Sequence, residues 1–117
     1  MKDKTALTLA ILLFAVAHTL TWLNINSQFK WEFWRDKPFL SACIYAIPTS
    51  LLFWYGTKVS YGPLEGAWGA RLLGFASSYF VFPLMTYFFL GESAFEPKTF
   101  ACIVLSFCII AIQLFWK

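Results

Sequence analysis

Residues 65–92, with the sequence EGAWGARLLGFASSYFVFPLMTYFFLGE, decide the fold of the chain. Within this stretch, residues 72–90 carry no formal charge. At ~1.5 Å of rise per residue, such a run covers the hydrocarbon core of a bilayer, which is roughly 30 Å thick. Ala70, Gly74 and Ser78 recur at every fourth position, and a stripe of small residues lets a second helix backbone approach closely. The stretch therefore predicts a transmembrane helix that packs against its neighbours.

The composition of the whole chain indicates a membrane protein. Of its 117 residues, 60% are hydrophobic and only 13% are charged, and the mean hydropathy is +0.66. A soluble domain of this size would expose far more contiguous apolar surface than soluble monomers do. The formal net charge of +3 is small and not clustered, so nothing indicates nucleic acid as a partner. The lipid bilayer is the expected surrounding.

Three further apolar runs complete an all-α, polytopic bundle of four transmembrane helices. Pro38 and Pro97 each stand where a helix can begin, and Gly91 follows the third run. The sequence contains no linker and no second domain, so residues 1–117 are predicted to form a single membrane domain. The predicted spans cover residues 5–24, 38–56, 66–90 and 97–116.

The segments between the spans have their own signals. Residues 29–37, FKWEFWRDK, mix aromatic with charged side chains, which suits the headgroup layer and predicts an interfacial loop or a short surface helix. Residues 56–62 are the expected connector between the second and third spans. Pro48 interrupts the second span, and within a membrane the carbonyl that it frees can be satisfied by Thr49 or Ser50.

The first apolar run has a second interpretation. Residues 15–17, AVA, resemble the cleavage site that follows the short hydrophobic segment of a secretory signal peptide. Apolar character continues beyond these residues, however, so we interpret the run as the first membrane span.

An even number of spans places both termini on one side of the membrane. Bacterial-type inner (plasma) membrane proteins retain an excess of basic residues on the cytoplasmic side. The terminal side carries five basic residues and the other side four, which favours termini in the cytoplasm. Five against four is nearly a tie, and a near-tie also permits insertion in both orientations. The five are Lys2, Lys4, Lys58, Arg71 and Lys117, and the four are Lys30, Arg35, Lys37 and Lys98.

His18 is the ionisable residue that lies deepest in a predicted span. It shares a helix face with Phe14 and Trp22, at steps of four residues. One interpretation is a neutral histidine that forms a hydrogen bond to another helix. The other is a proton-linked or ligand-contacting site, because imidazole gains or loses a proton near neutral pH.

Arg71 stands at the mouth of the third span and also has two interpretations. It can be an interfacial anchor that contacts the headgroups, with a cation–π contact to Trp68. Alternatively, its guanidinium turns inward and holds an anion. Glu65 is a candidate ion-pair partner. The candidate substrate-binding residues are Arg71, His18, Trp22, Trp68, Tyr45 and Ser78.

No signature of an enzyme, a cofactor or a metal site is present in the sequence. The chain has one histidine, and its acidic residues lie at the ends of predicted helices, where they are solvated. Cys43, Cys102 and Cys108 form no CxxC pair and fall inside apolar runs, so we expect them to be small buried hydrophobic residues.

The pattern of spans resembles the drug/metabolite transporter superfamily. The shared features are four short spans, a third helix rich in small residues and the turn Leu90-Gly91-Glu92. In that group, a last helix pair of the form FFLGE…P…F…C…L…II..Q typically closes a transport unit, and the similarity is clearest over residues 75–116. Small multidrug resistance proteins carry a glutamate in the first helix, whereas residues 13–22, LFAVAHTLTW, contain no acid. This departure argues against export of cationic drugs.

The resemblance implies an antiparallel homodimer in which helices one to three line a central chamber and the fourth helps the subunits associate. Two inverted copies would bring His18 and the level of Arg71 within roughly 10 Å of depth, given ~1.5 Å per residue. The leading hypothesis is thus a small secondary transporter that moves an anionic, zwitterionic or neutral small metabolite by alternating access. The alternatives are a non-transporting accessory or assembly subunit of a larger complex and a lipid-carrier flippase.

Overall fold

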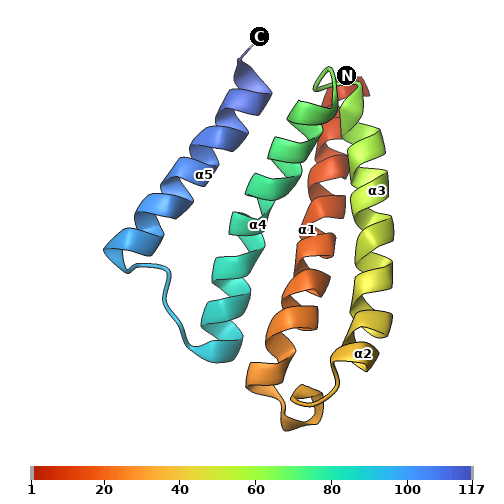
Figure 1. The fold of residues 1–117 in the computed structure, drawn as a ribbon. Helices are drawn as coiled ribbons and strands as arrows, with labels where there is room; N and C mark the ends of the chain where they lie inside the picture. The colour runs from red at the N-terminus through yellow and green to blue at the C-terminus, as the bar shows by residue number, and fades with distance from the viewer. Residues whose placement is uncertain (1, 117) are drawn as a thin grey trace.

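A computed structural model describes residues 2–116, and within them the regular structure is helical, without strands (Figure 1). Four long helices are joined by short segments, of which the one before α3 contains three brief helical pieces. The elements are α1 (Lys2–Lys30), η1 (Glu32–Trp34), α2 (Pro38–Ser41), η2 (Ala42–Ala46), α3 (Ile47–Tyr61), α4 (Ala67–Leu90) and α5 (Pro97–Phe115).

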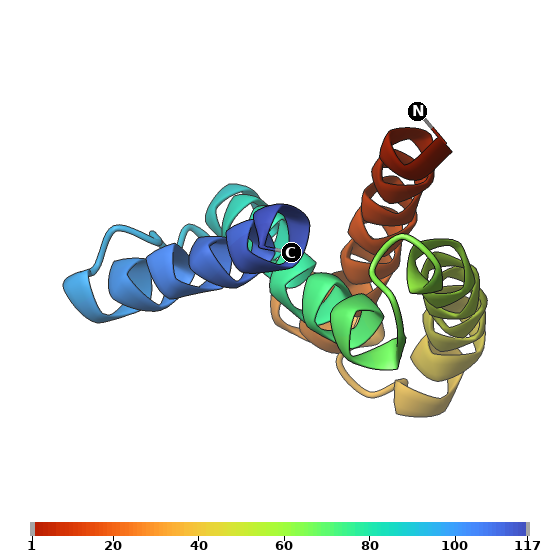
Figure 2. The ribbon, with the colours of Figure 1, turned by 90° about the horizontal axis from the view of Figure 1, so that it is seen from above.

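Helices α1, α3 and α4 pack together, whereas α5 lies apart and contacts α4 (Figures 1 and 2). The core sits between α1 and α4, where Ala10, Phe14, Leu73 and Ala76 are almost completely buried. Ile110 of α5 reaches the edge of the same cluster. The molecule is therefore a three-helix group with a fourth helix on its outer side.

Three segments of the described chain are long and apolar enough to cross a membrane: Lys4–Lys30, Pro38–Tyr61 and Ala67–Leu90. Pro97–Ile112 is a shorter apolar helix. Large apolar side chains cover the outside of the molecule, and Phe39 is 83% exposed. Helices that are apolar on their outer as well as their inner faces are compatible with an integral membrane protein.

Two of the predicted helix ends were wrong. The first helix continues to Lys30 instead of ending at residue 24, because polar residues alone do not stop a helix, and Ser27 is buried. The second helix continues through Gly56 to Tyr61, so residues 56–61 of the predicted connector at 56–62 belong to α3. Phe29 and Lys30 therefore belong to α1, and only the following residues form the interfacial segment, which includes η1.

Gly56 lies within α3, at a position where the side chain of another helix occupies the space that a Cβ atom would take. A Cβ atom placed on Gly56 would lie 2.7 Å from Cε1 of Phe14, and one on Gly74 would lie 3.1 Å from the same atom. The Phe14 ring is thus held between two glycines, one on α3 and one on α4. The cost of glycine in a helix is offset here by close approach of the helices.

The small-residue stripe of α4 is real but follows a different line from the predicted one. Ala70 and Gly74 are buried as expected, whereas Ser78 is half-buried and Ser77 is 1% exposed. Each four-residue step drifts about 40° around a helix of 3.6 residues per turn, so two such steps carry Ser78 about 80° away from Ala70. A four-residue step followed by a three-residue step keeps Ser77 within about 20° of Ala70, on the buried face.

The prolines and the closing glycine also have definite local roles. The π-helical turn η2 ends two residues before Pro48, and the Thr49 hydroxyl donates a 2.7 Å hydrogen bond to the Tyr45 carbonyl. Helix α4 continues through Pro83 and ends at Gly91, whose φ of 72° makes it a left-handed cap, as the sequence indicates.

The prediction that the cysteines are buried was wrong for a single chain. Cys43, Cys102 and Cys108 are all exposed. Among the described side chains of α5, the buried ones form one narrow line against α4, namely Ile103, Ser106 and Ile110, and the two cysteines on this helix lie outside that line.

Candidate functional site

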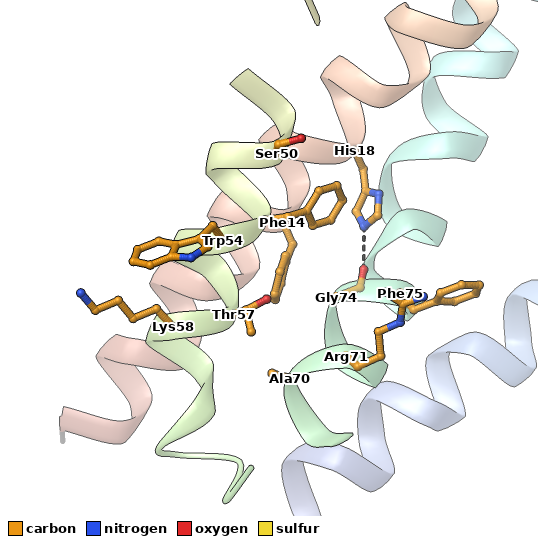
Figure 3. A pocket seen from close by; sticks show the side chains of 11 residues that line it. Phe14, His18, Ser50, Trp54, Thr57, Lys58, Ala70, Arg71, Gly74 and Phe75 are labelled. Carbon is orange, nitrogen blue, oxygen red and sulfur yellow. Dashed lines mark hydrogen bonds between the residues drawn. The ribbon is translucent and has the colours of Figure 1, made fainter. Parts of the chain in front are cut away.

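A groove with a volume of about 730 Å³ lies between α3 and α4, with α1 as its floor (Figure 3). It runs from the middle of the three-helix group toward the end where α3 stops and α4 begins. Four phenylalanine and tryptophan side chains contribute to its lining: Phe14, Phe53, Trp54 and Phe75. Cavities of this size hold small organic ligands in other proteins.

His18 forms the inner end of the groove and links α1 to α4. Its Nε2 atom lies 2.6 Å from the carbonyl oxygen of Gly74. A carbonyl oxygen only accepts, so Nε2 carries the hydrogen and Nδ1 remains for a proton or a ligand. Gly74 has no side chain to keep the ring away from the backbone. The ring also packs edge-on against Phe53, with 5.0 Å between ring centroids.

Arg71 lies on the α4 wall of the groove, one turn before Gly74. The cation–π contact predicted with Trp68 forms instead with Phe75, which follows Arg71 by one helical turn. The guanidinium carbon lies 5.9 Å from the centroid of the Phe75 ring. Among the described side chains, no carboxylate lies within 4.0 Å of the guanidinium, and Glu65 is no exception. Glu65 stands instead in the tight turn before α4, with a φ of 59°.

Lys58 is a groove residue that the sequence analysis missed. It lies on the α3 wall, and its Nζ atom is 5.3 Å from the centroid of the Trp54 ring. The two residues are separated by one helical turn. The i, i+4 spacing was readable in the sequence, but the prediction of a connector at residues 56–62 removed Lys58 from the helix.

Trp22 and Ser78 line a second, smaller cavity of about 190 Å³, to which His18 also contributes. Trp22 is only 2% exposed, and its Nε1–H donates a 3.0 Å hydrogen bond to the hydroxyl of Thr86. This bond connects α1 to the second half of α4. The Trp22 ring is thus fixed between the two helices, and His18 is the one predicted site residue that borders both cavities.

Tyr45 and Trp68 lie outside both cavities. Tyr45 packs against Trp34, with 5.4 Å between ring centroids, and Trp68 is 80% exposed in the first turn of α4. The structure therefore brings together Arg71 and His18 in the groove, and His18, Trp22 and Ser78 in the smaller cavity. His18 and Arg71 line the same groove within one chain, so an inverted second copy is not needed to bring them to one cavity.

The chemistry of the groove follows from its charges. Lys58 and Arg71 contribute two cations, His18 contributes an imidazole, and no acidic side chain lines the groove. Among the described residues, no three His, Cys, Asp or Glu side chains lie close enough to hold a metal ion. The groove is suited to binding an anion through its cations.

Compared with models of known protein families, with curated proteins and with solved structures, the chain matches none.

Proposed function

We propose that the protein is a small secondary transporter of the drug/metabolite transporter type, inserted in the membrane through four helices. It moves a small organic anion by alternating access. The observation that carries the proposal is the groove itself, which combines Arg71, Lys58 and His18 with an aromatic lining and no carboxylate. An anion is favoured over the zwitterionic and neutral metabolites because two cations line one cavity and no carboxylate among the described side chains lines it with them.

The proposed transporter works as an antiparallel homodimer. Helix α5 supports this proposal, because its buried residues, among those whose side chains the structure describes, are Ile103, Ser106 and Ile110, and much of its remaining apolar surface is uncovered. Leu105, for example, is 64% exposed. A second copy packed on these faces would bury them, and it would cover the open side of the groove to form a shared chamber.

The proposed location is a bacterial-type inner membrane. One copy of the proposed dimer has both termini in the cytoplasm, and its inverted partner has them on the opposite side. The first turn of α1 and the last turn of α5 lie at the same end of the molecule (Figure 1). Lys4, Lys58 and Arg71 belong to this end. With Lys2 and Lys117, the sequence has five basic residues on the terminal side and four on the other, and this excess of one favours termini in the cytoplasm. So small an excess also permits insertion in both orientations, which an antiparallel dimer requires.

A second candidate function is an accessory subunit that packs against a larger membrane complex. Its support is the number of large aromatic side chains on the outside, where Phe39, Trp68 and Phe95 are each at least 80% exposed. Purification from native membranes with a mild detergent discriminates the two. A stoichiometric partner protein favours the accessory subunit, whereas a homodimer favours the transporter.

Uptake into proteoliposomes tests the transporter directly. Benzenesulfonate, glycine and tetraphenylphosphonium serve as anionic, zwitterionic and cationic probes. We expect benzenesulfonate uptake above that of empty liposomes, and Arg71→Gln lowers it by about tenfold, because a charge-assisted contact is lost.

The matched control is Arg35→Gln, which removes a cation from the opposite end of the molecule, away from the groove. Equal benzenesulfonate flux in Arg71→Gln and wild type contradicts the role of Arg71. Flux of tetraphenylphosphonium alone contradicts the anionic assignment.

A further inference from the structure

The groove has two ends of different chemical character. Lys58 lies one turn before the end of α3, and Arg71 lies in the second turn of α4, so both cations mark the outer end. Ser50 and His18 mark the inner end, near the middle of the helices. Along α3, Ser50 and Lys58 are separated by about 12 Å, at ~1.5 Å per residue. The groove is therefore elongated along the helices, with its charge at one end.

Each cation rests on an aromatic ring and has no carboxylate beside it among the side chains that the structure describes. The Lys58 ammonium lies over Trp54 and the Arg71 guanidinium over Phe75, at 5.3 and 5.9 Å respectively. Both residues line the groove, and their side chains extend from its two opposite walls, Lys58 from α3 and Arg71 from α4 (Figure 3). An incoming anion would not have to displace an acidic side chain from either cation.

The section between the two ends is mostly apolar. Phe14, Phe53, Ala70 and Gly74 line it without any polar side-chain atom, and Thr57 adds a single hydroxyl (Figure 3). A ligand that is polar along its whole length would lose its hydration here without gaining partners. A ligand with an apolar body would gain by burying it. The volume of about 730 Å³ suits one drug-sized molecule and not a lipid with two long chains.

We propose that the groove binds a single-chain amphiphilic organic anion, with its acidic head at the Lys58–Arg71 end and its apolar body over Phe14 and Phe53. The identification of this molecule as the transported substrate rests on the transporter function proposed above. Lys58 and Arg71 select the charge of the ligand, and the aromatic floor selects its apolar body. His18 and Ser50 close the inner end.

Quenching of tryptophan fluorescence by brominated amphiphiles tests this inference on the full chain in phosphatidylcholine nanodiscs. Three probes share one bromododecyl chain and differ in their heads: a sulfonate, an alcohol and a trimethylammonium. Trp54 lines the groove, so the difference between wild type and Trp54→Phe isolates its quenching. We expect a saturable component for the sulfonate, with an affinity at least about tenfold higher than that for the alcohol.

Variants of the groove separate the role of charge from that of shape. Lys58→Gln combined with Arg71→Gln should reduce the affinity for the sulfonate to that for the alcohol. Both residues are exposed, so the fold should tolerate the change. The matched control is Arg35→Gln combined with Lys98→Gln, two cations that lie outside the groove. Ser50→Phe places a ring at the inner end and should abolish saturable quenching by both probes.

Three results would overturn the inference: equal affinity for sulfonate and alcohol, preference for the trimethylammonium, or saturable quenching that survives Ser50→Phe. The binding measurement needs no flux, so the two proposals fail separately. Uptake of benzenesulfonate without saturable sulfonate quenching overturns the amphiphilic ligand alone. Saturable sulfonate quenching without flux of any probe supports the amphiphilic ligand and overturns the transporter.

Discussion

The three-helix group and α5 differ in how they use the same apolar composition. In α1, α3 and α4, Phe14 fits between two glycines, and hydrogen bonds join α1 to α4 through His18 and Trp22. On α5, the described side-chain hydrogen bond is that of Ser106, and it stays within the helix, at the carbonyl of Cys102. Shape and polar contacts thus specify the three-helix group, whereas α5 is attached by a narrow apolar line.

This difference predicts where substitutions should change the stability of the protein. In a bilayer, lipid chains are as apolar as leucine, so helices gain little from burying apolar surface and depend on close packing and hydrogen bonds. The three-helix group contains both, and it also contains the groove. Helix α5 contains little of either, which leaves it available for contact with another chain.

The largest expected effect is that of Phe14→Ala. The Phe14 side chain is 1% exposed, and removing it leaves a cavity between three helices. We expect a loss of about 3–5 kcal/mol in the free energy of unfolding. Leu105→Ala on α5 is the control, expected to change stability by less than about 0.5 kcal/mol. Titration of detergent-solubilised protein with SDS, followed by circular dichroism, measures both. Similar losses in the two variants would remove the distinction between the regions.

Gly56→Ala should have the next largest effect. Its Cβ atom would lie 2.7 Å from the buried Phe14 ring, so overpacking should cost about 1–3 kcal/mol despite the better helix propensity of alanine. The double variant with Phe14→Leu should recover part of the loss, because a smaller side chain leaves room for the new methyl group. If Gly56→Ala stabilises the protein instead, the ring is not confined between the two glycines.

The smallest effect concerns the hydrogen bond between Trp22 and Thr86. Thr86→Val keeps the volume but leaves the buried Nε1–H of Trp22 without its acceptor. The expected loss in stability is about 1 kcal/mol. Thr86→Ser retains the hydroxyl and should unfold close to wild type in the same SDS titration. A loss as large for the serine variant as for the valine variant would assign the effect to packing and not to the hydrogen bond.

Much of the helical framework was readable in the sequence. The apolar runs, the prolines at positions 38 and 97, and Gly91 indicated where helices begin and end, and α2, α4 and α5 follow these signals. The helix ends at residues 24 and 56 were wrong for one reason. Neither polar residues nor a glycine ends a helix when tertiary contacts bury them, as happens to Ser27 and Gly56.

The candidate site was only partly readable. Ionisable residues inside apolar runs are rare, so His18 and Arg71 stood out without any knowledge of the fold. Lys58 did not, because its place in the groove depends on α3 continuing past Gly56. Tyr45 and Trp68 were chosen for their chemistry, but they lie away from both cavities because rotation of each helix about its axis decides which face meets a neighbour.

By itself, the sequence determined an all-helical chain whose apolar runs are suited to a bilayer, since run length and composition are local properties. Only the tertiary structure decided which side chains share a cavity. The placement of Phe14 between Gly56 and Gly74 sets how closely α3 and α4 approach α1. That spacing, which no local pattern encodes, brings Lys58, Arg71 and His18 around one groove.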